Sequence, residues 1–552
     1  MPSSLDDHDV TWSLDRLVLA DGMLCAMGWC ASRNNTRPIV TLIMIAPGGE
    51  EIRFPLECIL DRPDVHASWP DLSPQCGFFL YVPIAADKTL VSAAIEFDFG
   101  EENPVRVALS LEGATEGNPG DWKKNLAVHY CRRLVSHLWR GNWSLIYQRA
   151  KASIPVLFTK RFSLDELEQR LDALPPNTLL VVDHALGGGA NHYRDEMIGK
   201  HSHDGRFVLL WTFSIVTLSH QLSFIAPGGE KSNVKVDLSA WNSLVRCRKI
   251  STLIFNNCVS FPKPEDFPER LVKFVQAFPG ERQLTMLVHD FFTVCPSHFL
   301  LNHQGKYCGL PGIDTCQRCL PALNDPLANL YVPKNMELWR TLWGKALTQA
   351  TEIICFSENT RSLLLKAYPN LPRERLRVVP HKVDYLSGQY VGDQSLPRLR
   401  VAMVGQIGKH KGSEEYISLI EVAKQRRYPI DFYVIGSLNG STKPPEVIET
   451  GAYQRNDLAD LFNRQKIHMV LMLSIWPETF SYVTHELIKL GIPLLSYDVG
   501  AQGDAVRSYT FGRTIALGSD ANALLDCIDS FRRELESSSA GSVSISPLSS
   551  ND

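Results

Sequence analysis

The sequence predicts two successive α/β domains with parallel sheets, which follow a small β-sandwich domain and a helical connector. Residues 10–112 contain short stretches of β-branched and aromatic residues at roughly ten-residue spacing, which is typical of an antiparallel sandwich. Residues 121–151 carry apolar side chains every four residues, which is the spacing of one helix face. From residue 175, nearly continuous apolar strands alternate with helical segments, which indicates parallel sheets buried on both faces.

Composition and charge exclude several classes of protein. The chain has 552 residues, of which 44% are hydrophobic and 21% charged, which is typical of a globular chain of about three to four domains. Its formal net charge of −4 argues against a general nucleic-acid binder, and no apolar run approaches the roughly 18 residues of a membrane-spanning helix. The N-terminus, MPSSLDDHDV, is acidic and polar and does not resemble a secretory signal. We therefore expect a soluble, cytoplasmic protein whose 13 cysteines are reduced thiols or metal ligands.

The β-sandwich domain is predicted over residues 1–112 and contains no motif that we can tie to chemistry. Turn clusters such as the one that starts at Pro47 separate its strands. The expected strands are Trp12–Val18, Met23–Trp29, Ile39–Ile45, Gly77–Val82 and Val105–Leu109.

The connector is predicted over residues 113–174 as a turn-rich linker, GATEGNPG, followed by a basic amphipathic helix. Residues 121–151 hold seven Lys and Arg side chains against one Asp, a local charge of +6. Trp122, Trp139 and Trp143 lie around the apolar stripe, and basic residues with interfacial tryptophans are what a helix on an anionic membrane uses. The alternative, which we favour, is that the stripe packs against the rest of the protein, because buried amphipathic helices outnumber membrane-surface helices in soluble proteins.

The two α/β domains are predicted over residues 175–390 and 391–535, and the Ser-rich tail over 536–552 is expected to be disordered. The expected strands of the first domain are Thr178–His184, Phe207–Phe213, Ile250–Phe255, Leu284–Val288 and Glu352–Phe356. Those of the second are Arg398–Val404, Phe432–Gly436, Met469–Leu473 and Leu494–Tyr497, with helices over Ser413–Arg426 and Phe480–Leu490. Two α/β domains in tandem commonly bind a ligand in the cleft between them.

Three glycines follow the first strand of the first α/β domain. Gly187, Gly188 and Gly189 let the backbone approach a ligand closely, and the helix that follows presents free N–H groups. The loop matches the dinucleotide fingerprint poorly, because His192 occupies the third glycine position and the next strand lacks the acidic residue that binds a ribose. A plain strand-to-helix turn is the alternative.

A second glycine-rich loop, GQIGKHKG, occupies residues 405–412 at the equivalent corner of the second domain. It begins with Gly405, and Lys409 and Lys411 supply positive charge for phosphate groups, which backbone N–H groups can orient. The GxxxxGK[ST] pattern of a P-loop is absent from it. A solvated lysine loop without a ligand is the alternative.

Acidic and histidine side chains lie near the carboxyl ends of other predicted strands. Glu478 and Glu486 flank the start of a helix for which Ser481 is the expected N-cap, so both acids can face one ligand. The helix macrodipole favours acids at this position without any ligand, which is the alternative. His289 directly follows a strand, where open α/β sheets bind ligands, and an ordinary buried histidine is the alternative there.

Four of the cysteines lie close together in the sequence, within an insert over residues 295–319 that ends in CxxC. This spacing suits tetrahedral structural zinc in a reducing compartment, and free thiols or a redox pair are the alternatives. A catalytic metal is not expected, because the insert has no HExxH helix. The four residues are Cys295, Cys308, Cys316 and Cys319.

With these motifs in this order, the chain resembles the family-4 glycosyltransferases of the GT-B fold over roughly residues 175–535. WPETFSYVTHELIKLGIPLLSYDVGAQGD contains a pair of acids that looks like the E-x7-E signature of that family. GQIGKHKG matches its GRLxxxKG loop in spacing, VVPHKVDY is similar to its VPHGVD hinge strand, and LGGGANHYR matches the glycine loop of its N-terminal half. HDFFTVCPS, YCGLPG and CQRC resemble a subset that acts in bacterial polysaccharide and rhamnan-type synthesis.

The resemblance implies roles for the matching residues toward a nucleotide sugar. Glu486 would accept the ribose hydroxyls, Glu478 would lie at the sugar, and His289 would contact that sugar near the reacting carbon. Lys411 would neutralise the diphosphate. Gln406 replaces the arginine of the GRL motif, so one of the two cations expected at the diphosphate is missing. The other residues assigned to this side of the site are Gly188, Gly189, Gly405, Lys409, Phe480 and Ser481.

The implied reaction is transfer of a hexose or deoxyhexose, with retention of configuration, from a nucleotide-diphosphate donor to a growing glycan or lipid-linked saccharide. This resemblance implies a hexosyltransferase of class EC 2.4 that needs no cofactor for catalysis and serves bacterial surface polysaccharide synthesis, in the cytoplasm or at the inner face of the cell membrane. Two alternatives stay open, because a fold does not determine a function. One is a catalytically idle GT-B module that binds sugar or acts as a scaffold, which Gln406 favours. The other is a nucleotide-sugar epimerase or hydrolase.

Overall fold

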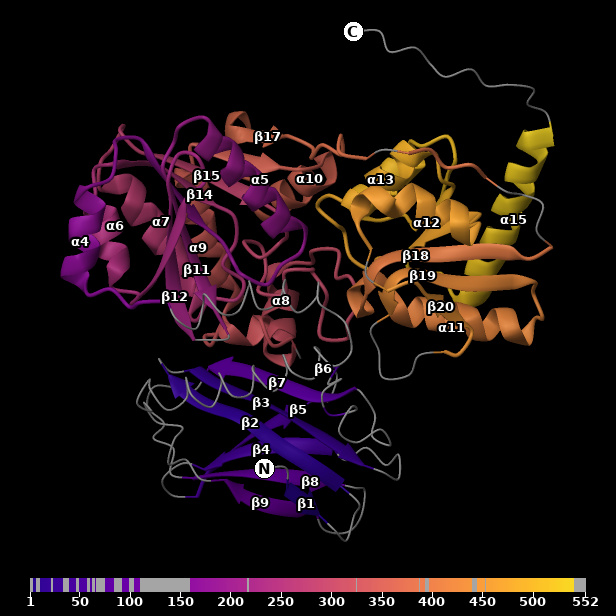
Figure 1. Cartoon of the computed structure of the whole chain (residues 1–552), viewed down its shortest axis with the longest axis horizontal. Helices are drawn as coiled ribbons and strands as arrows, with labels where there is room; N and C mark the ends of the chain where they lie inside the picture. The colour runs from indigo at the N-terminus through magenta and orange to yellow at the C-terminus, as the bar shows by residue number, and fades with distance from the viewer. Residues whose placement is uncertain are drawn as a thin grey trace. The chain divides into compact units, whose positions relative to one another are not determined.

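The computed structural model of the chain (Figure 1) forms two compact units. One consists of Met1–Thr285 with Asn324–Lys334, and the other of Met286–Leu323 with Asn335–Asp552. The connector helix predicted over 121–151 lies outside the described residues. The structure describes residues 3–5, 10–20, 23–32, 39–45, 49–56, 60–61, 65, 75–83, 92–98, 104–109, 159–215, 218–323, 325–386, 388–392, 397–438, 444–451 and 453–540.

The N-terminal region forms two antiparallel sheets, with strand orders β1-β2-β3-β7-β6 and β5-β4-β8-β9. Their strands are β1 Ser3–Leu5, β2 Val10–Ala20, β3 Met23–Ser32, β4 Ile39–Ile45, β5 Glu51–Leu56, β6 Leu60–Asp61, β7 Gln75–Pro83, β8 Ser92–Asp98 and β9 Val105–Leu109. Alternate side chains of both sheets meet in one core that includes Trp12, Leu42, Phe78 and Phe97. Each strand predicted for this region is confirmed, because its β-branched and aromatic residues bury one face of a sheet.

The first α/β sheet has the strand order β13-β12-β11-β10-β14-β15-β16-β17. Its strands are β10 Thr178–Val182, β11 Val208–Ser214, β12 Ser219–Ile225, β13 Lys231–Val236, β14 Ile250–Phe255, β15 Gln283–Val288, β16 Glu352–Cys355 and β17 Leu376–Val378. The strand predicted over Thr178–His184 is too long by two residues, because β10 ends at Val182. Asp183 and His184 therefore lie in the loop that leads to the glycines.

A hairpin of β12 and β13 at one end of this sheet was not predicted from the sequence. Both of its strand pairings are antiparallel, β12 with β11 and β12 with β13. The strands alternate polar and apolar side chains, and the turn between them contains Gly228 and Gly229. They carry no continuous apolar run of the kind used to locate the buried strands, which is why they were missed.

Helices connect the strands of this sheet. They are α4 Leu164–Asp172, α5 Gly189–His203, α6 Ala240–Arg246, α7 Phe267–Gln276, α8 Ile313–Cys319, α9 Met336–Gln349 and α10 Glu358–Ala367, with 3-10 turns η2 Pro264–Asp266, η3 Leu320–Ala322, η4 Ala328–Leu330 and η5 Arg373–Arg375. The long connection between β15 and β16 contains α8, α9 and all four clustered cysteines. It is far longer than the usual short connection in an α/β domain.

The second α/β sheet has six parallel strands in the order β20-β19-β18-β21-β22-β23. Its strands are β18 Leu399–Ile407, β19 Ile430–Leu438, β20 Val447–Glu449, β21 Met469–Met472, β22 Leu494–Tyr497 and β23 Gly512–Ile515. Counted along the chain, this order is 3-2-1-4-5-6, that of a Rossmann domain, which binds ligands at the carboxyl ends of the strands where the order reverses. The loops after β18 and β21 lie at that reversal point and carry the predicted site motifs.

Helices connect the strands of this sheet. They are α11 Ser413–Gln425, α12 Leu458–Gln465, α13 Tyr482–Leu490, α14 Gly500–Arg507 and α15 Ala521–Ala540, with 3-10 turns η6 Lys409–Lys411 and η7 Arg455–Asp457. Of these helices, α11 and α13 were predicted from the sequence, and the other three were not. The predicted disordered tail starts too early, because α15 continues past residue 536 to Ala540 with an apolar face packed on the core. Residues 541–552 lie outside the described part of the chain.

The predicted α/β architecture is confirmed, because two α/β domains built mainly on parallel strands follow an antiparallel β region. Among the helices that the structure describes, none has the length and the apolar run needed to cross a bilayer.

Gly412 permits a close approach between α11 and the end of β21. Its φ is +87°, and a Cβ added there would lie 2.2 Å from the carbonyl oxygen of Leu473. Because both the backbone conformation and the space require glycine, Gly412→Ala is expected to destabilise the protein by about 2–4 kcal/mol, and thermal unfolding would show a lower midpoint. Gly199→Ala is the control, since Gly199 lies inside α5 and a Cβ there meets nothing within 4 Å. Equal midpoints for the two variants would contradict this reasoning.

Candidate functional site

Side chains behind the glycine loop hold it in place between β10 and α5. Asp183 is fully buried and accepts hydrogen bonds from Asn191 Nδ2 at 2.7 Å and Arg194 Nη1 at 3.0 Å. Asn191 in turn accepts a hydrogen bond from the backbone N–H of Gly187 at 2.6 Å and donates one to the carbonyl of His184 at 3.0 Å. The loop is therefore tied at both ends to one buried polar network.

The glycines themselves face open space. Gly187 and Gly188 have φ angles of +88° and +87°, and a Cβ added to either meets nothing within 4 Å. Gly188 is the N-cap of α5, which begins at Gly189 and runs for 15 residues. This geometry leaves the first N–H groups of a long helix accessible, as the sequence predicts for a phosphate-facing loop.

Asp183 gives the first unit a defined pH dependence. Burial raises its pKa from 3.8 to about 6, against the opposing charge of Arg194. A raised pKa means that the folded state binds the proton more tightly than the unfolded state, so stability from this group is greatest at low pH and falls as pH rises from about 4 to about 6. Relative to the Asp183→Asn variant, the free energy of unfolding of the wild-type protein is expected to fall by about 3 kcal/mol across that window. Unfolding curves of both proteins, recorded at each pH, measure this difference. A difference that stays constant with pH would show that Asp183 is ionised throughout.

The loop after β18 places its two lysines differently. Lys411 points back toward Gly405, with its Nζ 3.8 Å from the position of a Cβ on that glycine. Lys409 instead makes an exposed ion pair with Glu414 at 3.1 Å and lies beside Gly305. Gln406, which replaces the expected arginine, is exposed near the end of β18. Of the two lysines, Lys411 is thus the one directed at the glycine of the predicted phosphate loop.

Three predicted site residues meet at one small cavity in the second sheet. Lys411, Glu478 and Ser481 all line a cavity of about 20 Å³ at the carboxyl ends of β18 and β21. The rest of its lining is Met403, Val404, Ile407, Leu471, Met472, Leu473, Ser474 and Val483. Ser481 is the N-cap of α13 and accepts a hydrogen bond from the N–H of Thr484, which confirms the cap expected from the sequence. The cavity therefore combines a lysine, a carboxylate and a capped helix N-terminus.

The loop that carries Glu478 is fixed by buried side chains. Glu478 is itself buried and accepts a hydrogen bond from the hydroxyl of Ser474. Gln502 on α14 is 0% exposed, accepts from the backbone N–H of Glu478 at 3.1 Å and donates to the carbonyl of Trp476 at 2.9 Å. Because an unpaired amide would be costly at this depth, Gln502 sets the path of the loop. No local motif indicates this role of Gln502, because 24 and 26 residues separate it from its two partners along the chain.

The second acid, Glu486, lies in a separate cluster on α13. Its side chain is 1% exposed, accepts a hydrogen bond from the hydroxyl of Tyr385, and lies 3.7 Å from Nε of Arg455. The Arg455 guanidinium also donates to the Tyr385 oxygen at 3.1 Å and lies over the rings of Tyr385 and Tyr482, with centroid distances of 5.4 and 5.1 Å. Burial and the Glu486 carboxylate raise the pKa of Tyr385, so its hydroxyl keeps its proton and donates. Neither Tyr385 nor Arg455 was predicted as a site residue.

His289 belongs to an aromatic cluster with side chains from the segments that follow β16 and β17 and from the segment before α13. Its ring stacks on Phe356 at 4.3 Å, and Phe356 stacks on His381 at 4.1 Å. Phe480 meets His381 edge-on at 4.6 Å. Thr479 connects the same regions, since its hydroxyl donates to the carbonyl oxygen of His289 at 2.6 Å. The structure thus brings together His289 and Phe480, two of the residues predicted from separate motifs.

The four clustered cysteines are present as free thiols. Burial raises the pKa of Cys295 to about 12 and also raises the pKa values of Cys308 and Cys316, so these side chains are neutral thiols as placed. Within the described part of the chain, no group of three or more His, Cys, Asp and Glu side chains is arranged to hold a metal ion. As placed, the thiols therefore do not fit a zinc site, and structural zinc stays a prediction from the spacing alone.

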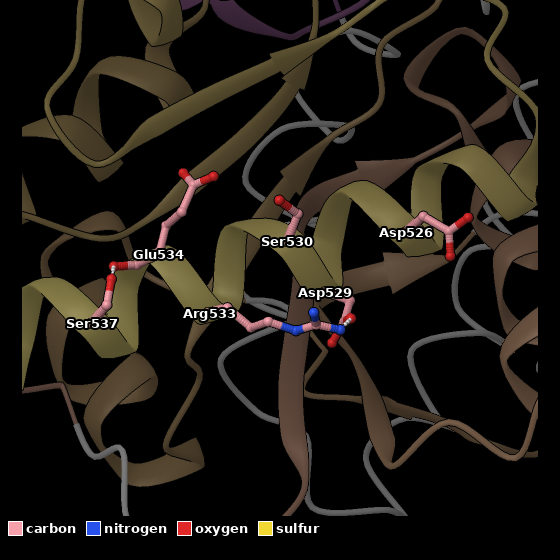
Figure 2. Close-up of a pocket in the computed structure, with 6 residues that line it drawn as sticks. All are labelled: Asp526, Asp529, Ser530, Arg533, Glu534 and Ser537. Atoms are coloured by element: carbon pink, nitrogen blue, oxygen red, sulfur yellow. Dashed lines mark hydrogen bonds and ion pairs between the residues drawn. The ribbon is translucent and has the colours of Figure 1, made fainter.

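Two larger cavities contain none of the predicted site residues. One of about 510 Å³ lies along α15, and Figure 2 shows its lining residues on successive turns of that helix. Its acids are already paired: Asp529 with Arg533, Glu534 with Arg513, and Asp526 with Arg426. The other, of about 340 Å³, lies between α5 and the β12–β13 hairpin.

Outside the cysteine insert, the predicted site residues fall into four groups, and Lys409 lies apart from all of them. Gly188 and Gly189 belong to the first unit, and the remaining predicted residues outside the cysteine insert belong to the second. Within the second unit one cavity joins Lys411, Glu478 and Ser481, and one aromatic cluster joins His289 and Phe480. Glu486 lies with Tyr385 and Arg455, and Gly405 lies beside Lys411, while Lys409 points elsewhere.

No family model matches the sequence, and no curated protein matches it. Among solved structures, Anabaena HepE in complex with UDP-glucose is 16% identical, with a TM-score of 0.39, covering 65% of this chain and 90% of that chain. Sucrose-phosphate synthase from Thermosynechococcus elongatus is 13% identical, with a TM-score of 0.42 and the same coverage, 65% and 90%. The apo form of the lipopolysaccharide outer core galactosyltransferase WaaB is 11% identical, with a TM-score of 0.41, again covering 65% and 90%.

Proposed function

We propose that this chain is a glycosyltransferase that transfers a sugar from a nucleotide-diphosphate donor to a growing glycan. The observation that carries the proposal is the meeting of Lys411, Glu478 and the capped N-terminus of α13 at one cavity, at the strand-order reversal of a Rossmann-type sheet. A lysine and a helix N-terminus are suited to a diphosphate, because both place positive charge where the leaving group gathers negative charge.

The chemistry proposed for this site is mainly electrostatic and positional. When the bond from the sugar to the diphosphate breaks, Lys411 and the first N–H groups of α13 stabilise the charge that develops on the diphosphate. Glu478 lies beside them and is held in a fixed orientation by the hydrogen bond from Ser474, so it is placed to bind a hydroxyl of the sugar. Gln502 keeps the backbone of this loop in position for both.

Glu486 is proposed to anchor the ribose of the same donor. Its carboxylate is buried but already oriented by the Tyr385 hydroxyl and the Arg455 guanidinium, so little reorganisation is needed when ribose hydroxyls donate to it. Arg455 also supplies a positive charge beside this carboxylate.

His289 is proposed to contact the sugar near the reacting carbon. The stack with Phe356 and the Thr479 hydrogen bond to its carbonyl hold the residue in one place at the end of β15. Retention of configuration, the hexosyl type of transfer and membership of family 4 are further parts of the proposal, and the motif resemblance is their support.

A transfer assay over a panel of nucleotide sugars tests the function directly. Incubation with each donor and a mixture of mono- and oligosaccharide acceptors should release free nucleoside diphosphate together with a new glycoside for at least one donor. Release of free sugar with no glycoside would favour a hydrolase, interconversion of the sugar would favour an epimerase, and binding without turnover would favour an idle module. No binding of any donor would remove the proposed function.

The acceptor and cellular place are proposed from the resemblance as a lipid-linked saccharide in bacterial polysaccharide synthesis, at the inner face of the cell membrane. The basic helix predicted over residues 121–151 offers a test, because attraction to anionic lipid is screened within about 8–10 Å at physiological salt. Co-sedimentation with anionic vesicles that fades with salt would support contact with the membrane. No sedimentation at low salt would leave the helix as internal packing, the alternative that we favour for it.

The spacing of the cysteines in the insert allows structural zinc, free thiols or a redox pair. Of these three, zinc can be measured directly as bound metal. Structural zinc in Cys295, Cys308, Cys316 and Cys319 would appear as about one equivalent of metal in protein purified from zinc-containing medium. Elemental analysis that finds no zinc, together with reactivity of all 13 thiols of the chain after unfolding without reductant, would show free cysteines. No catalytic step is assigned to this metal.

A further inference from the structure

The cysteine-rich connection between β15 and β16 lies against both loops of the cavity site. Its segment 298–305 belongs to the same compact unit as those loops. Leu301 packs against the core of the second α/β domain, and Gly305 lies beside Lys409, with 3.2 Å from a Cβ position on the glycine to the lysine Cε. This connection therefore does more than join two strands of the first sheet.

Phe299 makes the most extensive of these contacts. Its ring lies parallel to the ring of His410, with a centroid distance of 4.7 Å and an angle of 9°. The same ring contacts the indole of Trp476 at 4.5 Å and 49°. His410 lies in the loop of Lys411, and Trp476 lies two residues before Glu478, so one phenyl ring bridges the two loops.

The two loops are also connected directly at this point. The backbone N–H of Ile475 donates to the carbonyl of His410 at 3.1 Å. Burial, with Lys411 and His298 as smaller causes, lowers the pKa of His410 to about 4, so the imidazole beside Phe299 is neutral near pH 7. A neutral ring stacks on a phenyl ring without the desolvation cost of a charge, which makes the contact favourable as it stands.

Phe299 is in turn held by the connection on which it lies. The N–H of Phe291, shortly after β15, donates to the carbonyl of His298 at 3.0 Å. On the other side, the N–H of Cys308 donates to the carbonyl of Leu300 at 3.0 Å. The path of the chain around Phe299 thus depends on a turn that includes one of the clustered cysteines.

We propose that Phe299 is a positioning residue, which holds the loops over residues 405–412 and 474–479 in the arrangement that binds the diphosphate of the donor. The proposal rests on the proposed function, because it assigns that ligand to Lys411 and the N-terminus of α13 at the ends of these loops. It gives the cysteine-rich connection a role in donor binding through the packing of Phe299 on His410 and Trp476.

Three variants separate this role from general stability. Phe299→Leu removes the ring but keeps an apolar side chain, and Phe299→Tyr keeps the ring. Phe511→Ala is the matched control, since Phe511 is 37% exposed and precedes β23, away from both loops. All three are made in the full-length protein, and their thermal midpoints are compared first.

Hydrogen–deuterium exchange of the two loops is the first readout. Phe299→Leu is expected to raise the exchange rate of residues 405–412 and 474–479 by about 10-fold or more, while Phe299→Tyr and Phe511→Ala leave it unchanged. Unchanged exchange in Phe299→Leu overturns the proposal, and so does an equal rise over the whole unit, because the effect would then be one of general stability.

Binding of inorganic pyrophosphate is the second readout, since it requires no knowledge of the base or sugar. Calorimetric titration of Phe299→Leu is expected to show a dissociation constant about 5- to 50-fold above wild type, with Phe299→Tyr close to wild type. An unchanged constant overturns the proposal. If the wild-type protein does not bind pyrophosphate, the diphosphate assignment of the cavity fails, and the proposed function is separately judged by the donor panel.

Discussion

Replacing Lys411 by methionine is expected to lower kcat for sugar transfer by about 100- to 1000-fold. The substitution keeps the length and the apolar stem of the side chain but removes the ammonium group directed at Gly405. A preorganised charge at a leaving diphosphate acts mainly in the transition state, and loss of one such group typically costs about 3–4 kcal/mol of activation free energy. Initial rates at saturating donor measure the effect.

Two other lysines show whether position, and not charge alone, decides this result. Lys409→Met is expected to change kcat far less, because Lys409 is exposed and paired with Glu414. Lys424→Met serves as the control, since that side chain is exposed on α11 and pairs with Glu446 at 2.8 Å. If Lys409→Met were as damaging as Lys411→Met, Lys409 would act in place of the arginine that Gln406 replaces.

Replacing Glu486 by alanine is expected to weaken binding of the donor about 10- to 100-fold. The ribose hydroxyls lose a charged acceptor, and a hydrogen bond to a charged group is worth roughly 1.5–3 kcal/mol. The change also leaves the hydroxyl of Tyr385 and the guanidinium of Arg455 without this partner in a mostly buried place. Part of the loss of affinity would therefore come from disorder of Tyr385 and Arg455. Titration calorimetry with a nucleoside diphosphate measures the two contributions together.

Glu486→Gln separates the two contributions. Glutamine keeps the shape and can still accept from Tyr385, but it carries no charge for Arg455. We expect its affinity to lie between those of the wild-type protein and Glu486→Ala, while Glu421→Ala, an exposed change on α11, leaves affinity unchanged. A folded Glu486→Ala variant that binds the donor as tightly as wild type would contradict the ribose assignment.

Nine strands of the two α/β sheets were predicted from the sequence, because each contains an apolar run that is buried on both faces. β14 and β22 match their predicted bounds, and the other seven differ by one to three residues at one or both ends. The short strands β17, β20 and β23 were not predicted, since none of them carries such a run. Ser481 as the N-cap of α13 and its last residue, Leu490, were also predicted, since capping is decided by the few residues around a helix terminus. The β12–β13 hairpin was missed because its strands are half polar.

The candidate loops of the site could be located from motif spacing alone, because it places Lys411, Glu478 and Glu486 after particular strands. The contacts of each residue depend on the folded structure. It turns Lys411 toward Gly405 and pairs Lys409 with Glu414, and it brings Tyr385 to Glu486 across a separation of 101 residues. Such contacts depend on the packing of whole elements against one another, and no local pattern of residues encodes them.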